Sequence, residues 1–181
     1  MIPKDLERRE TVAQAVLSKE ALMEENRERG QKALRVCFVC TGNTCRSPMA
    51  EAVANHLAQN LGRDVKAFSA GLYAAVGDPI SPNAVMALEN AAVKAFPDCD
   101  YHRHTAHSLG DGEAETYDLL VGMGKSHVME LMLRFPHLAR RILCMPTPIS
   151  DPFGGDLSVY ETCLEEITKG VRELLFSGDV T

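Results

Sequence analysis

The chain has 181 residues, which suits a single domain with a sizeable core. Apolar residues make up 45% of it and charged residues 24%, as in soluble globular proteins. The net charge of −6 disfavours nucleic acid and anionic membranes as partners, because both are negatively charged.

The first segment, residues 4–29, predicts a charged helix that ends at Gly30. Its apolar residues form only a loose stripe, so the helix either packs lightly on the domain or serves as a dimerisation or partner helix. The sequence decides neither this role nor the oligomeric state.

Targeting signals are missing from the same segment. Residues 1–32 carry seven basic and seven acidic side chains and no apolar core of a signal peptide. No run in the chain approaches the roughly 18 apolar residues of a membrane span. We therefore expect a cytoplasmic protein with no membrane partner. Its six cysteines are expected to be reduced, since disulfide scaffolds are short and secreted.

Strand and helix patterns alternate through the rest of the chain. Short apolar runs predict strands at 33–40, 65–69, 118–123 and 141–145, and helical spacing follows at 48–61, 83–95, 126–135 and 157–176. The segment 98–113 is polar and is expected to be irregular. This order predicts an α/β fold, a single doubly wound domain whose four-stranded parallel sheet has helices on both faces, plus the N-terminal helical extension. In such sheets ligands bind at the carboxyl ends of the strands, which points to the loops 40–47, 70–81, 98–113 and 146–156.

The loop between the first strand and its helix has the features of an anion site. Gly42 and Asn43 tolerate a positive φ, so successive backbone N–H groups can curl around a phosphate or another oxyanion. The helix that follows begins near Pro48 and adds its free N–H groups and dipole, and Arg46 adds a fork that matches phosphate oxygens. The whole loop reads Cys40-Thr41-Gly42-Asn43-Thr44-Cys45-Arg46-Ser47.

These surroundings favour the thiolate of Cys40 over the thiol, because cationic neighbours and helix N-termini stabilise a negative sulfur. A thiolate at the base of a phosphate cradle can attack phosphorus without a separate base. The expected product is a phosphocysteine, which water then hydrolyses.

The segment Val39–Pro48 matches V-C-x-G-N-x-C-R-S-P, the signature of the low-molecular-weight protein tyrosine phosphatases, which the chain resembles from about residue 34 to residue 176. The resemblance implies a phosphatase domain at 34–181, an extension at 1–33, phosphorylated proteins as substrates and no cofactor or metal. It also extends to three shorter motifs: Ser69-Ala70-Gly71, His104-Thr105-Ala106 and Asp151-Pro152.

The resemblance assigns roles to individual residues of the loops. Asp151, before Pro152, is expected to be the general acid. Ser47 is expected to hydrogen-bond the Cys40 thiolate, and Asn43 to support the loop. Cys45 is expected to trap oxidised Cys40 as a reversible disulfide. Physics alone does not separate Asp151-Pro152 from a second Asp-Pro pair, Asp78-Pro79, in another loop at the same sheet edge.

Two local features concern the substrate. Most tyrosine-specific members carry a branched aliphatic residue where this chain has Thr44, and an aromatic pair where it has Phe153 and Gly154. Thr44 together with Asp151-Pro152-Phe153-Gly154-Gly155 resembles the bacterial protein arginine phosphatase branch. A hydroxyl and one ring fewer suit a polar guanidinium better than a phenyl ring. Thr44 is equally compatible with neutral variation in a tyrosine phosphatase, so both substrates stay open.

Other candidate motifs carry less weight. Cys37 and Cys40 are three residues apart on a strand, which places their side chains on opposite faces. His102, His104 and His107 could hold a metal, but loop and supporting roles are favoured. Residues 122–126 resemble part of a nucleotide-binding loop, but Leu119 stands where that loop needs glycine.

Two further function classes fit the sequence less well. An arsenate reductase shares the loop but needs two more cysteines close together, and Cys99, Cys144 and Cys163 are far apart in sequence. A phosphopeptide-binding module without activity would have no need of Cys40, Arg46 and Asp151 together.

Overall fold

The computed structural model describes residues 33–177, and the predicted helix at 4–29 lies outside them. All strands of the described chain join one parallel sheet in the order β2-β1-β3-β4. The strands are β1 (Leu34–Cys40), β2 (Val65–Gly71), β3 (Leu119–Gly122) and β4 (Ile142–Cys144). The helices are α2 (Arg46–Asn60), α3 (Pro82–Asn90), α4 (Asp111–Ala114), α5 (Lys125–Arg134) and α6 (Leu157–Leu175), with 3₁₀ turns η1 (Tyr101–Arg103) and η2 (Pro136–Arg141).

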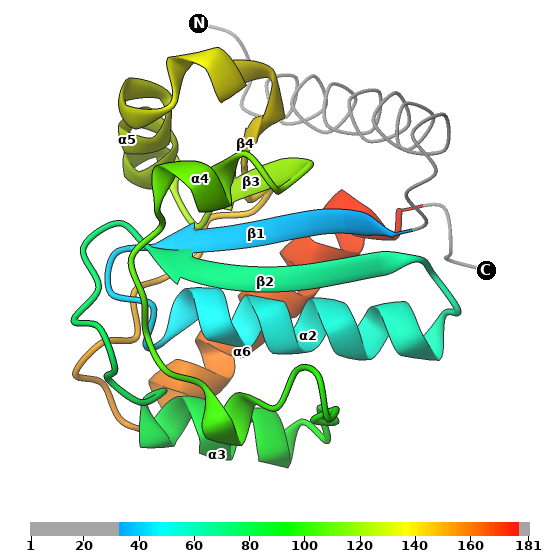
Figure 1. Cartoon of the computed structure of the whole chain (residues 1–181). Helices are drawn as coiled ribbons and strands as arrows, with labels where there is room; N and C mark the ends of the chain where they lie inside the picture. The colour runs from blue at the N-terminus through cyan, green and yellow to red at the C-terminus, as the bar shows by residue number, and fades with distance from the viewer. Residues whose placement is uncertain (1–32, 178–181) are drawn as a thin grey trace, which may run out of the picture.

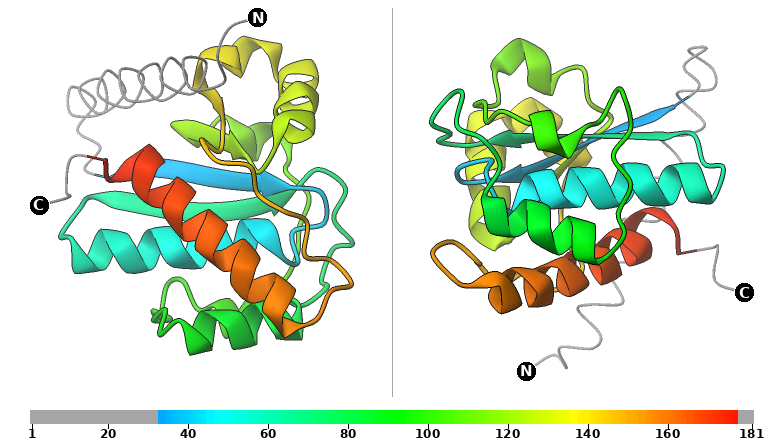
Figure 2. Two further views of the ribbon diagram at one scale, coloured as in Figure 1. Left: turned by 180° about the vertical axis from the view of Figure 1, so that it is seen from behind. Right: turned by 90° about the horizontal axis from the view of Figure 1, so that it is seen from below.

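Helices cover both faces of the sheet, as the alternation of the sequence predicts. Figure 1 shows α2 and α3 below the strands and α4 and α5 above them, and the view from behind in Figure 2 shows α6 crossing in front of the strands beside α2. The core is accordingly split in two. The larger part packs α2, α3 and α6 against Val36 and Phe38, and the smaller part packs α5 and η2 against Cys37 and Val39.

Strand order explains why the first loop is a ligand site. The chain moves from β1 outward to β2 and then crosses to β3 on the other side of β1, so the carboxyl end of β1 lies where the winding reverses. At that end Cys40 pairs in register with Gly71, and Val39 with Gly122. The loop after Cys40 therefore opens at the position where doubly wound sheets hold ligands.

β2 is an edge strand, and side chains and a loop cover part of its outer side. The Asn55 amide donates from Nδ2 to the Ala67 carbonyl (2.9 Å) and accepts from the Ala67 N–H at Oδ1 (3.0 Å), as a neighbouring strand would. Further along, Gly71 exchanges backbone hydrogen bonds with His107 and Leu109.

Two predicted helix ends and one segment predicted to be irregular differ from the structure. α2 begins at Arg46 rather than at residue 48, because the loop runs directly into the helix and proline is tolerated in a first turn. α3 ends at Asn90 rather than at 95, and Ala92 then takes a left-handed φ of 53°. The segment 98–113 is not fully irregular, since it contains η1 and α4. None of the helices in residues 33–177 has the length and apolar content that a bilayer span requires.

Candidate active site

A cavity of about 300 Å³ opens at the carboxyl end of β1. Most of its wall comes from the first loop, and the rest comes from the loop before α6. It is lined by Cys40, Thr41, Gly42, Thr44, Cys45, Arg46, Asp151 and Phe153. The structure thus brings together eight residues from two segments about a hundred positions apart, all of them predicted as site residues.

Cys40 lies at the base of this cavity with its sulfur held by donors. The Asn43 N–H donates to Cys40 Sγ (3.3 Å), and Ser47 Oγ lies 3.0 Å from the same sulfur. Asn43 adopts a left-handed φ of 56°, which turns its N–H inward. α2 begins at Arg46, so the positive end of its dipole faces the loop. This geometry is suited to a negative sulfur beneath a bound anion.

The buried Asn43 side chain fixes the loop through three neighbours. Its Nδ2 donates to Ser47 Oγ and to Ser69 Oγ, both at 3.0 Å. Its Oδ1 accepts the His107 N–H at 3.1 Å, and His104 Nε2 contacts the Asn43 carbonyl at 2.9 Å. Because Ser47 Oγ accepts from Asn43, its own proton can be donated to Cys40 Sγ at 3.0 Å or to the Ala70 carbonyl at 3.4 Å. The sheet, α2 and the 104–107 segment therefore all hold one loop conformation.

A carboxyl group ends this network on the side away from the cavity. Ser69 Oγ donates to Glu51 Oε2 at 2.6 Å, and the Cys99 thiol lies 3.8 Å from Glu51 Oε1. Burial raises the pKa of Glu51 to about 7, although the Ser69 and Cys99 hydrogen bonds act in the opposite direction. Nothing in the sequence pattern around Glu51 indicated this contact.

Arg46 and Asp151 form the charged wall of the cavity. Arg46 Nη2 donates to Asp151 Oδ2 at 2.8 Å; the arginine side chain is 12% exposed and the aspartate 56%. The backbone N–H of Phe153 donates to Asp151 Oδ1 at 3.3 Å, which orients the carboxylate toward the cavity. Phe153 itself is 80% exposed and stands at the mouth. Asp78, the alternative acid, does not line this cavity.

His127, at the start of α5, is a site residue that sequence reasoning missed. Its Nε2 lies 3.1 Å from Thr41 Oγ1, while its buried Nδ1 has no hydrogen-bond partner in residues 33–177. Burial, with the Arg46 charge as a smaller cause, lowers the pKa of His127. A neutral imidazole therefore contacts the rim of the loop from a segment 86 residues away.

Tyr160, in the first turn of α6, is the second residue that was missed. Its hydroxyl lies 3.3 Å from Cys45 Sγ and accepts from Ser81 Oγ at 3.0 Å. Burial raises the pKa of Tyr160 to about 12, with the Cys45 contact as the next cause. Cys40 and Cys45 are both free thiols in the structure.

The remaining candidate residues point to other partners. Cys37 packs in the smaller core on the face of the sheet opposite Cys40. His102 contacts Asp100 and Glu89, whereas His107 Nε2 contacts Glu113. These imidazoles do not converge, and no metal-binding group of three His, Cys, Asp or Glu side chains occurs within the described residues.

Similarity to known proteins extends over most of the chain. The model of the family "Low molecular weight phosphotyrosine protein phosphatase" matches residues 35–179. The chain is 30% identical over 146 residues to the protein-arginine-phosphatase of Bacillus subtilis, covering 77% of this chain and 93% of that protein. It is 33% identical to the protein-arginine-phosphatase of Geobacillus stearothermophilus, covering 74% and 88%. A probable low molecular weight protein-tyrosine-phosphatase, EpsP of Ralstonia nicotianae, is 31% identical, covering 75% and 90%.

Solved structures give the same result for the fold. A low molecular weight protein tyrosine phosphatase from T. tengcongensis superposes with a TM-score of 0.72 at 36% identity, covering 80% of this chain and 99% of that one. The YwlE arginine phosphatase, in a mutant with a phosphorylated active-site serine in place of cysteine, superposes with a TM-score of 0.72 at 28% identity, covering 81% and 97%.

Proposed function

The chain belongs to the low molecular weight phosphotyrosine protein phosphatase family, and from that premise we propose that it removes phosphate from phosphoarginine in proteins through a phosphocysteine at Cys40. The observation that carries the choice of substrate is Thr44 in the wall of the cavity. Phe153 is the one aromatic side chain among the described residues that line the same cavity.

In the first step the Cys40 thiolate attacks phosphorus, so that an S–P bond forms as the bond to the leaving nitrogen breaks. The backbone N–H groups of the loop and the Arg46 fork receive the phosphoryl oxygens and stabilise their negative charge in the transition state. The phosphorylated active-site serine of the YwlE mutant supports an enzyme-bound phosphoryl group at this position.

Asp151 supplies the proton that the leaving nitrogen needs. It lines the cavity with Cys40, and a bound phosphoryl group would compete for the Arg46 guanidinium that Asp151 now holds at 2.8 Å. In the second step the Asp151 carboxylate takes a proton from water, which attacks phosphorus, and phosphate and the Cys40 thiolate are released.

The leaving group explains why the cavity wall matters. A phosphoarginine presents a planar guanidinium with several N–H donors. The Thr44 hydroxyl and the Asp151 carboxylate can accept hydrogen bonds from these donors. A phosphotyrosine presents a phenyl ring, which gains most from apolar walls on both sides. Here Gly154 follows Phe153, and no second aromatic side chain of residues 33–177 lines the cavity.

Tyrosine is the second candidate substrate, because relatives named as tyrosine phosphatases are about as similar to this chain as those named as arginine phosphatases. The test is to measure phosphate release by the purified full chain from matched phosphoarginine and phosphotyrosine peptides, with Cys40→Ser as the inactive control. We expect a higher kcat/KM for phosphoarginine. A strong preference for phosphotyrosine would overturn the arginine assignment and leave the phosphatase assignment intact.

A further inference from the structure

A second cavity of about 400 Å³ adjoins the active-site cavity. The two share Thr44, Cys45 and Phe153 in their walls. The rest of the second wall comes from the loop around Asp78, the start of α3 and the loop before α6. We call it the flanking cavity. A peptide whose phosphorylated side chain lies above Cys40 would pass this cavity with its next residues, since successive residues of an extended chain are only about 3.3 Å apart.

The floor of the flanking cavity is held in place by hydrogen bonds between its segments. The Ser81 N–H donates to the Thr44 carbonyl at 2.8 Å, and Asn83 Nδ2 donates to the Gly155 carbonyl at 3.1 Å. The Ser81 hydroxyl donates to Tyr160 at 3.0 Å. These contacts fix the shape of the floor and occupy the donors that could otherwise face a ligand.

Asp78 is the only formally charged side chain among the described residues that line the flanking cavity. Its carboxylate has no hydrogen bond or ion pair within residues 33–177, in contrast to Asp151, which is paired with Arg46. The backbone beneath it is fixed, because the Ala106 N–H donates to the Asp78 carbonyl (2.7 Å) and the Gly77 N–H to the Ala106 carbonyl (2.8 Å). An unpaired carboxylate on a fixed backbone beside an exposed phenyl ring is suited to a cation.

We propose that the flanking cavity is a subsite for a positively charged side chain, lysine or arginine, that neighbours the phosphorylated residue in the protein substrate, and that Asp78 is the residue that selects it. This inference rests on the proposed phosphatase function and adds a sequence preference to it. The two adjoining cavities then recognise opposite charges: the loop at Cys40 takes the phosphoryl group, and the flanking cavity takes the cation beside it.

The expected effect is modest, because Asp78 and its partner remain exposed to water. Exposed ion pairs of this kind correspond to a roughly two- to five-fold preference. Salt screens such pairs, so the preference should shrink as ionic strength rises to about 1 M, where the Debye length falls to about 3 Å.

The test uses the full chain and a panel of peptides that share one phosphorylated residue, of the type that the enzyme turns over faster. Lysine, glutamine or glutamate is placed, one position at a time, at the two positions before and the two positions after the phosphorylated residue. We expect a lysine-to-glutamine ratio in kcat/KM of about two to five at one or more positions, with glutamate poorest there. Asp78→Asn should bring that ratio to about one, and Asp78→Lys should favour glutamate.

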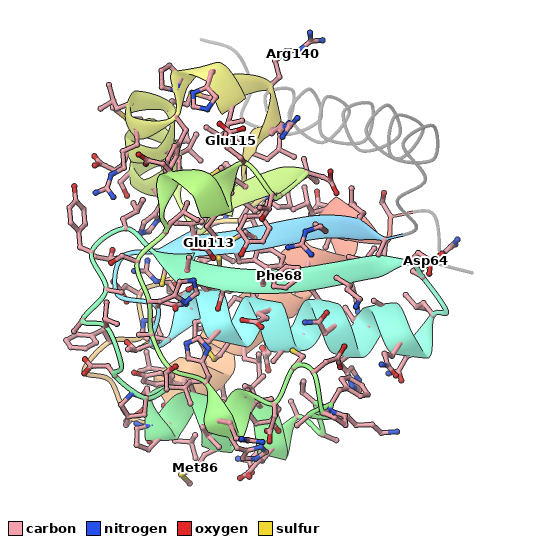
Figure 3. The ribbon with its side chains drawn as sticks, viewed as in Figure 1. Asp64, Phe68, Met86, Glu113, Glu115 and Arg140 are labelled. Carbon is pink, nitrogen blue, oxygen red and sulfur yellow. The ribbon has the colours of Figure 1, made fainter. Side chains whose placement is uncertain are left out.

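Asp64→Asn is the matched control, because Asp64 is an exposed aspartate at the opposite end of the sheet (Figure 3). This variant should keep the wild-type ratio. Phosphate release by the wild type from the peptides of the panel separates the two possible failures. If the peptides are turned over but their ratios are flat, or survive in Asp78→Asn, the subsite is wrong and the phosphatase stands. If the wild type releases phosphate from no peptide of the panel, the proposed function itself fails.

Discussion

Thr44 lies in the wall shared by the active-site cavity and the flanking cavity, one residue before Cys45. Replacing it by isoleucine removes a hydroxyl and adds an apolar surface that a phenyl ring can contact. We expect Thr44→Ile to move the ratio of kcat/KM for phosphotyrosine over phosphoarginine roughly ten-fold or more toward tyrosine. Matched peptides measure this ratio.

Thr44→Val is the control that separates the two causes, since valine has the shape of threonine but no hydroxyl. If Thr44→Val already shifts the ratio, loss of the hydroxyl is the cause of the change in substrate preference. If Thr44→Ile shifts the ratio and Thr44→Val does not, the added volume is the cause. An unchanged ratio in both variants would show that Thr44 does not discriminate.

Within residues 33–177, Asp151 is the only carboxylate that lines the cavity with Cys40. In the mechanism above it must protonate the leaving group while the phosphocysteine forms, so Asp151→Asn should lower kcat/KM for phosphopeptides by about 10²- to 10⁴-fold. The kcat/KM of a phosphate ester whose leaving group needs no proton should fall much less, because hydrolysis of the phosphocysteine, which also uses Asp151, comes after this step. Steady-state kinetics on both substrates measure kcat/KM, and Asp64→Asn should leave both values at the wild-type level. Equal losses on the two substrates would contradict an acid role.

The residues that sequence predicted for the site are those that are neighbours in the chain. Cys40, Asn43, Arg46 and Ser47 lie in one octapeptide, so their mutual contacts follow from local geometry and were visible in the motif. The contacts of Tyr160 with Cys45 and of His127 with Thr41 span 115 and 86 residues. No local pattern marks such partners, because only the packing of α5 and α6 against the sheet brings them to the loop.

At the scale of elements, the end of β2 sets how closely the loop can approach the sheet. A Cβ on Gly71 would lie 2.9 Å from the Thr41 carbonyl oxygen and 2.9 Å from the Ala74 Cβ. Gly71→Ala therefore requires the loop to move away from the strand. We expect it to cost about 1–3 kcal/mol of stability and to lower activity beyond what the loss of folded protein explains.

Gly112→Ala is the matched control, because nothing lies within 4 Å of a Cβ at Gly112, inside α4. Alanine has the better helix propensity, so this variant should be as stable as the wild type or slightly more so. Urea titration and phosphatase assays on both variants make the comparison. Wild-type behaviour of Gly71→Ala would show that the loop has room to adjust.

Most helices and strands were predictable from the sequence. The elements that were not predicted, α4 and η1, were missed for a physical reason. The two central strands, β1 and β3, are short apolar runs because both faces of a covered parallel sheet are buried, and such runs are visible in sequence. α4 and η1 are too short to show a period. Their positions depend on contacts such as Tyr117 with Glu113 (2.7 Å) and His104 with Asn43, which the sequence does not reveal.

For the molecule as a whole, Glu51 makes stability depend on pH in an unusual direction. Its folded pKa of about 7 exceeds the ordinary value, so the native state holds the proton more tightly than the unfolded chain. Glu51 raises the free energy of unfolding at low pH, where it is protonated in both states. This contribution disappears as the pH rises from about 4.5 through 7. We expect Glu51 to lower stability by roughly 2 kcal/mol between pH 5 and pH 8.

Urea titrations of the wild type and of Glu51→Gln at both pH values measure this contribution. Glutamine keeps an acceptor for Ser69 and cannot ionise, so its stability should fall less over the interval. Glu165→Gln, at an exposed position on α6, should follow the wild-type dependence. Identical dependences for all three proteins would show that Glu51 is already ionised at pH 5 or is freely hydrated.

The cover on the outer side of β2 has a consequence for the behaviour of the protein at high concentration. An uncovered edge strand can recruit a strand from a second molecule, which begins aggregation or the exchange of segments between molecules. The amide of Asn55 already occupies both backbone groups of Ala67, and the 107–109 segment occupies those of Gly71. A strand from a second molecule would have to displace the Asn55 amide and the 107–109 segment before it could pair along this side. The packing that holds His107 against the loop therefore also opposes association of the sheet with a second copy.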